Sequence, residues 1–214
     1  MKISKDDIRL CLVTDETMYK DEDHLAHIVS SAVAGGVTMV QLREKTADTK
    51  SKIRKGLLLK KVLYTSSVPL IINDDVEVAL TVDAEGVHLG QSDMPVNEAR
   101  KLLGKDKIIG ISVESKAHAI EANSLPVDYV GLSPVFQTGT KKDIATPLHL
   151  EGVREITELS HHHAMGIGGI HLQNAAEVVR AGADGIAVVS YLMQATDVKE
   201  AARCMKEAIE KECI

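Results

Sequence analysis

The sequence predicts one (β/α)8 barrel, and three features of its pattern favour that fold. Eight short apolar runs rich in β-branched residues are each followed by a longer segment with helical spacing, which is the repeat of a βα unit. Most of the runs are continuously apolar, as expected for strands buried on both faces of a parallel sheet. Eight units in 214 residues leave room for few insertions. This favours a compact barrel over an open doubly wound sheet, which usually has fewer strands.

The expected strands follow one another at the apolar runs. In chain order they are "LCLVTD" (10–15), "VTMVQLRE" (37–44), "PLIINDD" (69–75), "GVHLG" (86–90), "KIIGISV" (107–113), "DYVGLSP" (128–134), "AMGIGGI" (164–170) and "GIAVVS" (185–190). Helical spacing is clearest in "VNEARKLLG" (96–104), "NAAEVVRAG" (174–182) and "DVKEAARCMKEAIEKE" (197–212). Gly35, Gly104 and Gly182 end helical segments, which predicts left-handed C-caps. No Pro-, Gly- or Ser-rich linker divides the chain, so we expect one domain over residues 1–214.

The composition of the chain argues against some classes of binding partner. The formal net charge of -6 and an aromatic content of 2% argue against a nucleic-acid surface, which needs cations and stacking platforms. No apolar run approaches the ~20 residues of a membrane helix, and the charged start "MKISKDDIRL" lacks the apolar stretch of a signal peptide. Cys11, Cys204 and Cys213 are widely spaced, which favours reduced thiols. We therefore expect a cytoplasmic protein that acts on small molecules, has no membrane or nucleic-acid partner, and is compatible with a homo-oligomer.

Polar residues gather where the predicted strands end, which is the end of such a barrel that carries function. Hydroxyl, amide, cationic and carboxylate side chains are therefore expected around one mouth. They come from Gln41–Lys45, Asn73 and Asp74, Gln91–Asp93, Ser112, "SPVFQTGTKKD" (133–143), Gly168 and Gly169, and Ser190.

Two carboxylates at neighbouring strand ends suggest a metal site. Asp74 and Asp93 could together hold Mg2+, which usually takes one or two protein carboxylates beside phosphate oxygens and waters. The alternative is that each caps the helix that follows, because Asp is a preferred N-cap residue. The neighbouring cations favour the metal, whereas Asp75 is expected to be the cap of the next helix.

Cations and hydroxyls near these carboxylates suggest phosphate ligands. Alternate strand residues share a face, so Gln41, Arg43 and Lys45 are expected to line one side together. A surface salt-bridge patch around Glu44 is the alternative.

The run Thr138-Gly139-Thr140-Lys141 could cradle an anion, or could be a plain polar loop. Gly169 and Ser190, after the last two strands, lie where barrels often bind phosphate.

In order, these motifs resemble the thiamine-phosphate synthase family over nearly the whole chain. The resemblance rests on "LVTD", "GVTMVQLREK", "PLIIND", "GVHLGQSD", "GISVES", "DYVGLSPVFQTGTKKD", "GIGGI" and "GADGIAVVS". It implies a transferase that joins hydroxymethylpyrimidine diphosphate to a thiazole phosphate and releases diphosphate. Ser133 and Gln137 depart from the Gly and Pro that the family often has there, which bears on the shape of the threonine loop.

The resemblance also implies a role for each matched residue. The implied pyrimidine-diphosphate contacts are Gln41, Arg43, Lys45, Asn73, Ser112 and Lys141, with Arg43, Lys45 and Lys141 as the catalytic cations. The implied Mg2+ ligands are Asp74 and Asp93. The implied thiazole-phosphate site is Thr138, Thr140, Gly169, Val189 and Ser190. Leu42, Glu44 and Gly139 lie within the same motifs and are counted among the substrate contacts.

Three other functions fit part of the pattern. They are a thiazole tautomerase on a similar barrel, another sugar-phosphate barrel enzyme, and a non-catalytic phosphate-binding regulator. The resemblance implies that a tautomerase relies on a histidine and lacks the diphosphate and metal residues. The combination of Asn73, Asp74, Asp93 and Lys141 favours the synthase.

Overall fold

Eight parallel strands close into a barrel in chain order, each paired with its sequence neighbours and β8 paired with β1. The computed structural model describes residues 3–139 and 146–211. The strands are β1 (Leu10–Val13), β2 (Met39–Leu42), β3 (Leu70–Asn73), β4 (Gly86–Leu89), β5 (Ile108–Val113), β6 (Tyr129–Leu132), β7 (His163–Ile167) and β8 (Gly185–Val188). The predicted (β/α)8 fold is therefore confirmed, and one domain over residues 1–214 stays a prediction.

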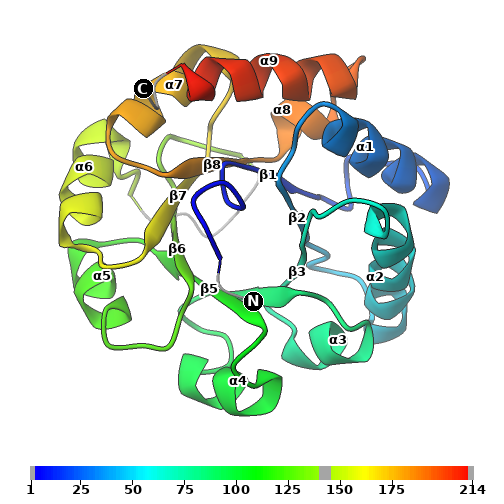
Figure 1. The fold of residues 1–214 in the computed structure, drawn as a ribbon, viewed down its shortest axis with the longest axis horizontal. Helices are drawn as coiled ribbons and strands as arrows, with labels where there is room; N and C mark the ends of the chain where they lie inside the picture. Colours follow the sequence, from blue (N-terminus) through cyan, green and yellow to red (C-terminus); the bar gives the residue numbers. More distant parts are fainter. Residues whose placement is uncertain (1–2, 140–145, 212–214) are drawn as a thin grey trace.

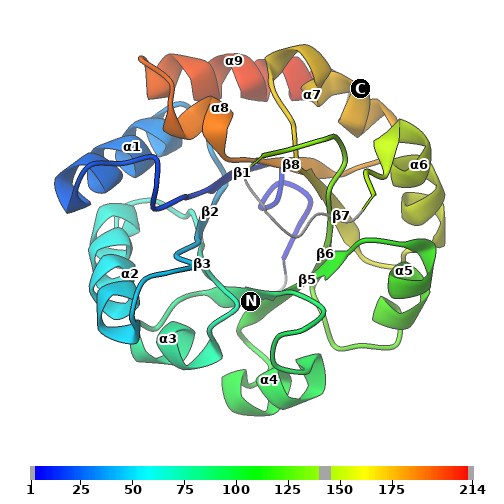
Figure 2. The ribbon, with the colours of Figure 1, turned by 180° about the vertical axis from the view of Figure 1, so that it is seen from behind.

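Helices form a ring around the barrel (Figure 1). They are α1 (Glu22–Ala34), α2 (Thr49–Leu63), α3 (Val76–Thr81), α4 (Val96–Leu103), α5 (Lys116–Ala122), α6 (His149–Leu159), α7 (Leu172–Arg180), α8 (Ser190–Met193) and α9 (Val198–Glu210). The short helix α8 follows β8 and lies under α9 (Figure 2). Among the described residues, no helix has the length and apolar character needed to cross a membrane.

The sheet separates two apolar cores. The larger core lies between the strands and the helix ring and includes Leu12, Ile28 and Val178. The smaller core fills the inside of the barrel with residues such as Cys11, Ile71 and Tyr129. Successive strand residues point to opposite faces, so a continuously apolar strand supplies both cores at once.

The amino end of the barrel is closed by the chain that precedes β1. Ile3 and Ile8 are buried and belong to the inner core, and this dark blue segment crosses the barrel in Figure 1. Gly185 at the start of β8 permits the approach, because a Cβ there would lie 1.9 Å from the Ile8 carbonyl oxygen. The carboxyl ends of the strands are left to form the mouth.

Helix ends follow the predicted capping chemistry in part. Asp75 is the N-cap of α3, and its carboxylate accepts from the Val78 amide, as predicted. Gly182 has the positive φ expected of a left-handed cap, at 112°. Gly104 also has a positive φ, of 74°, but its ψ of -171° lies outside the left-handed helical region. The prediction for Gly35 is wrong, because this residue keeps a helical φ of -86°. Gly36 makes the left-handed turn instead, with φ 107°, since α1 extends one residue further than the pattern suggested.

We expect Gly185→Ala to destabilise the protein by at least about 2 kcal/mol, because the clashing atom is backbone and cannot rotate away. The matched control is Gly139→Ala, at a glycine where an added Cβ has none of the described residues within 4 Å. Urea unfolding of both variants measures the difference. Equal stabilities would show that the segment before β1 does not seal the barrel as described.

Candidate active site

Two cavities open side by side at the carboxyl ends of the strands. The first, of about 480 Å³, contains most of the predicted diphosphate and metal residues. The second, of about 680 Å³, lies over the ends of β6, β7 and β8. The two cavities share part of their lining, and the shared residues are Val13, Arg43, Ser133 and Ile167. Below, the first is called the carboxylate cavity and the second the glycine cavity.

Asp74 and Asp93 meet in the carboxylate cavity and interact directly. Asp74 follows β3 with a left-handed φ of 66°, an uncommon conformation for a residue with a side chain. The Asp93 carboxylate accepts from the Gly90 amide at 2.7 Å. The first requirement for a shared cation, that both carboxylates face one space, is therefore met.

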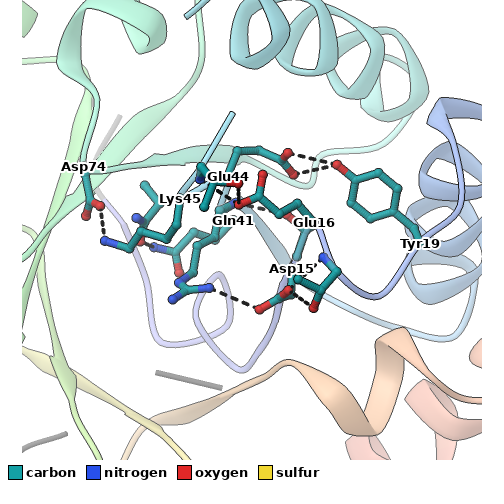
Figure 3. A network of polar contacts seen from close by, with 12 residues as sticks. Asp15, Glu16, Tyr19, Gln41, Glu44, Lys45 and Asp74 are labelled. Atoms are coloured by element: carbon teal, nitrogen blue, oxygen red, sulfur yellow. Dashed lines mark hydrogen bonds and ion pairs between the residues drawn. The ribbon is translucent and has the colours of Figure 1, made fainter. Parts of the chain in front are cut away.

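The two carboxyls have opposite pKa shifts. Burial alone would raise the pKa of Asp74, but hydrogen bonds from Lys45 and Asp93 outweigh it and leave that pKa below its usual value. Burial and the adjacent Asp74 carboxylate raise the pKa of Asp93. Lys45 Nζ lies 2.5 Å from Asp74 Oδ2, and Figure 3 marks this contact with a dashed line. Because two carboxyl groups share the space and a single ammonium contacts one of them, additional positive charge would be favourable here.

The donor set of this cavity fits a hard divalent cation. Within the described ranges, no cluster of three or more His, Cys, Asp or Glu side chains could hold a metal. Mg2+ does not require one, because it keeps several waters and takes substrate phosphate oxygens beside one or two carboxylates. Asp74 and Asp93 are the two residues that could supply those carboxylates.

The residues at the end of β2 alternate as predicted. Gln41, Arg43 and Lys45 all line the carboxylate cavity. Gln41 is 4% exposed and donates through Nε2 to Asn73 Oδ1 at 3.1 Å. Because this bond fixes the amide of Gln41, the Asn73 side chain is held at the same wall of the cavity.

Leu42 and Glu44 point the other way and line neither cavity. Leu42 belongs to the core outside the barrel. The Glu44 carboxylate accepts from the Tyr19 hydroxyl at 2.8 and 2.9 Å, a contact that Figure 3 shows, and it also pairs with Lys55. The alternative of a surface salt-bridge patch that joins Arg43 and Lys45 to Glu44 is therefore wrong, because Glu44 is buried behind the strand and pairs with neither.

Arg43 has a partner that the sequence reasoning missed. Its guanidinium lies 3.2 Å from the carboxylate of Asp15, a residue 6% exposed, and its backbone amide donates to Thr14 Oγ1 at 3.0 Å. Asp15 also accepts from the amide and hydroxyl of Thr17. Asp15 follows β1 as Asp74 follows β3, so the same strand-end signal could have identified it.

The far wall of the carboxylate cavity carries Ser112 and His88. His88 is 8% exposed and bonds to Ser112 through one ring nitrogen and to Tyr129 through the other. It is thus both packed and cavity-lining.

The glycine cavity contains most of the predicted phosphate residues. Thr138, Gly169, Val189 and Ser190 line it. Gly169 has φ 64°, and a Cβ there would lie 2.6 Å from the Gln137 carbonyl oxygen. Asn174 fixes the loop by donating to the Gly169 carbonyl at 3.0 Å, a contact that the sequence reasoning missed.

The other predicted substrate contacts of the threonine loop are Gly139, Thr140 and Lys141. Gly139 does not line the cavity. Thr140 and Lys141 lie outside the described residues.

Comparison with known proteins gives one consistent family. The family model described as thiamine monophosphate synthase matches residues 10–192. A thiamine-phosphate synthase of Albidiferax ferrireducens is 48% identical over 95% of this chain and 92% of its own. One from Clostridium acetobutylicum is 44% identical over 96% of each chain. Among solved structures, a thiamine phosphate pyrophosphorylase from Pyrococcus furiosus has a TM-score of 0.88 and 36% identity, covering 97% of this chain and 98% of its own.

We expect Glu44→Gln to destabilise the protein by about 2–4 kcal/mol, because it leaves the Lys55 ammonium, 14% exposed, without its carboxylate. Urea unfolding measures the loss. The matched control is Glu44→Gln combined with Lys55→Met, which removes both charges and should recover most of the stability. A single variant as stable as the starting protein would contradict this role for the pair.

Proposed function

The chain belongs to the thiamine monophosphate synthase family and is a transferase that acts on small molecules, and on that premise we propose which substrates it joins and how. The substrates are hydroxymethylpyrimidine diphosphate and a hydroxyethylthiazole phosphate, and the products are thiamine phosphate and diphosphate. Family membership confirms the resemblance seen in the ordered motifs and the class of enzyme that it implied.

The observation that carries the proposal is the pairing of two unlike cavities across one wall. The carboxylate cavity offers Arg43 and Lys45 beside an acidic pair, which suits a metal-bound diphosphate. The glycine cavity offers a backbone loop and the Ser190 hydroxyl, which suits a single phosphate. Two substrates of these charges would meet over the shared residues.

Arg43 and Lys45, the two proposed catalytic cations that the structure describes, would act on the diphosphate leaving group. As the bond to the pyrimidine CH2 breaks, negative charge concentrates on the diphosphate oxygens, and preorganised cations stabilise it. Arg43 is held for this by Asp15 and Thr14. Lys45 would turn from Asp74 toward the diphosphate. Lys141, the third proposed cation, is assigned by its motif alone.

Asp74 and Asp93 are the residues that would hold Mg2+. When bound, the ion neutralises charge that develops on the diphosphate and offsets the repulsion between the two carboxylates. Burial, and to a smaller extent the adjacent Asp74, raises the pKa of Asp93, so added positive charge there would favour its ionised form.

The attack of the thiazole on the pyrimidine CH2 depends on the position of the thiazole and not on proton transfer. The attacking thiazole nitrogen carries no proton, so no general base is required. The aminopyrimidine can delocalise the cation left behind, which favours a dissociative path. Gly169 and Ser190 would hold the thiazole phosphate so that its ring nitrogen faces the CH2 across the shared wall.

The direct test is to incubate the protein with both half-molecules and Mg2+ and to look for thiamine phosphate and diphosphate. A tautomerase would change the thiazole alone, and a regulator would bind phosphate without turnover. Either result, in the absence of thiamine phosphate, would refute the proposal.

For the metal residues, we expect Asp74→Asn and Asp93→Asn each to lower kcat by about 100-fold, since each removes a carboxylate from the ion that neutralises the leaving group. Asp75→Asn is the matched control. It changes the adjacent carboxylate, which caps α3 and pairs with Lys52, and Asn caps helices equally well. Mg2+ should raise the Tm of the control and not of the two variants. An Asp93→Asn enzyme with normal kcat at limiting Mg2+ would rule out the metal assignment.

For the phosphate residues, we expect Ser190→Ala to raise KM for the thiazole phosphate about tenfold, the effect of one lost hydrogen bond to a charged group. KM for the pyrimidine diphosphate should stay within about twofold, because Ser190 does not line that cavity. Ser124→Ala, at an exposed turn hydroxyl bonded to the Glu121 carbonyl, serves as the control. An increase confined to KM for the pyrimidine diphosphate would show that the two substrates are assigned to the wrong cavities.

A further inference from the structure

A chain of three side chains runs from the inside of the barrel to the carboxylate cavity. The Tyr129 hydroxyl lies 2.9 Å from His88 Nδ1, and His88 Nε2 lies 3.0 Å from Ser112 Oγ. Tyr129 is fully buried in the inner core, and Ser112 lines the cavity. The three residues come from β6, β4 and β5, and Ser112 lies two residues further along β5 than Gly110, which is in register with both Tyr129 and His88.

Two glycines create the space for this chain. Gly110 lies on β5 between His88 of β4 and Tyr129 of β6, paired in register with both. A Cβ at Gly110 would lie 2.2 Å from Tyr129 Cζ and 2.6 Å from its hydroxyl oxygen. A Cβ at Gly131 would lie 2.8 Å from His88 Cε1. Without those two glycines the rings could not meet, so the contact depends on the spacing of the three strands β4, β5 and β6 and not only on two side chains.

The direction of the protons follows from what each group can do. Among the described residues, the Tyr129 hydroxyl has one hydrogen-bond partner, His88 Nδ1, and no buried side-chain polar atom lacks a partner. A phenol that accepted from Nδ1–H would leave its own O–H unbonded inside the barrel, which is unfavourable for a buried donor. A phenol that donates has no such cost. Burial raises the pKa of Tyr129 well above its usual value, so the phenol keeps its proton.

The remaining protons are then assigned. If Nδ1 accepts from Tyr129, the neutral imidazole carries its proton on Nε2 and donates it to Ser112 Oγ. The Ser112 hydroxyl accepts from His88, and its own proton is left to point into the cavity.

We propose that Tyr129 is a positioning residue, which fixes the Nε2–H tautomer of His88 so that Ser112 presents a hydrogen-bond donor to an acceptor atom of the pyrimidine diphosphate. The identity of that ligand rests on the proposed function, whereas the tautomer does not. With the opposite tautomer, Ser112 would donate to His88 and turn a lone pair toward an anionic ligand. A buried hydroxyl remote from the substrate thus decides whether Ser112 attracts or repels it.

The tautomer is read by two-bond 1H–15N correlation on protein with 15N-labelled histidine, with His88 assigned from the signal lost in His88→Gln. We expect Nε2 to be protonated and Nδ1 to be bare in the substrate-free protein. In Tyr129→Phe, which removes only the hydroxyl, the single form should give way to a mixture or to Nδ1–H. Protonation of Nδ1 in the unaltered protein would overturn the proposal.

Kinetics then separate positioning from general loss of structure. We expect Tyr129→Phe to raise KM for the pyrimidine diphosphate about tenfold and to leave KM for the thiazole phosphate within about twofold. Ser112→Ala should have at least the same effect, and Tyr129→Phe should add almost nothing in the Ser112→Ala background, because the residues act as one unit. Full additivity would overturn the proposal.

The matched control is Met165→Leu, which alters packing in the same inner core without touching a hydrogen bond. It should change neither the His88 signals nor either KM. A Met165→Leu enzyme with the Tyr129→Phe kinetics would attribute the effect to packing and overturn the proposal. A protein that makes no thiamine phosphate and yet shows the Nε2–H form would refute the proposed function while supporting the positioning role.

Discussion

The repulsion between two carboxylates at the ends of β3 and β4 governs the electrostatics of the mouth. Asp74 and Asp93 face the same space, and burial makes their mutual repulsion stronger than it would be in water. The Lys45 ammonium offsets part of this repulsion. The left-handed backbone conformation of Asp74 costs of order 1 kcal/mol or more. This arrangement lowers stability at the place where we propose that Mg2+ binds.

Arg43 is the second organising element, because it belongs to both cavities. Its guanidinium is fixed by Asp15 and its backbone amide by Thr14, so both ends of the residue are tied to β1. A planar, permanently charged group held in this way has a fixed position between the two cavities. Under the proposed function, the distance between the two substrates would therefore be set by the strands and not by a flexible loop.

Much of this site could be predicted from the sequence, because strand ends and alternation are local rules. They correctly placed Gln41, Arg43 and Lys45 on one wall and identified Asp75 as a cap. The same rules gave no warning that Glu44 would turn to Tyr19 and Lys55, since those partners come from other parts of the chain. Asp15 was not predicted, although it also follows the end of a strand. The left-handed turn after α1 was assigned to Gly35 instead of Gly36, because hydrophobic periodicity does not locate the end of a helix to within one residue.

The segment before β1 closes the amino end of the barrel. Within the described residues, Ile3 and Ile8 fill the amino end of the interior, and both cavities of the site open at the carboxyl ends of the strands. Under the proposed function, both substrates and both products would use this same opening. Diphosphate that remained at the carboxylate wall would then obstruct the next substrate, so its release would bear on turnover.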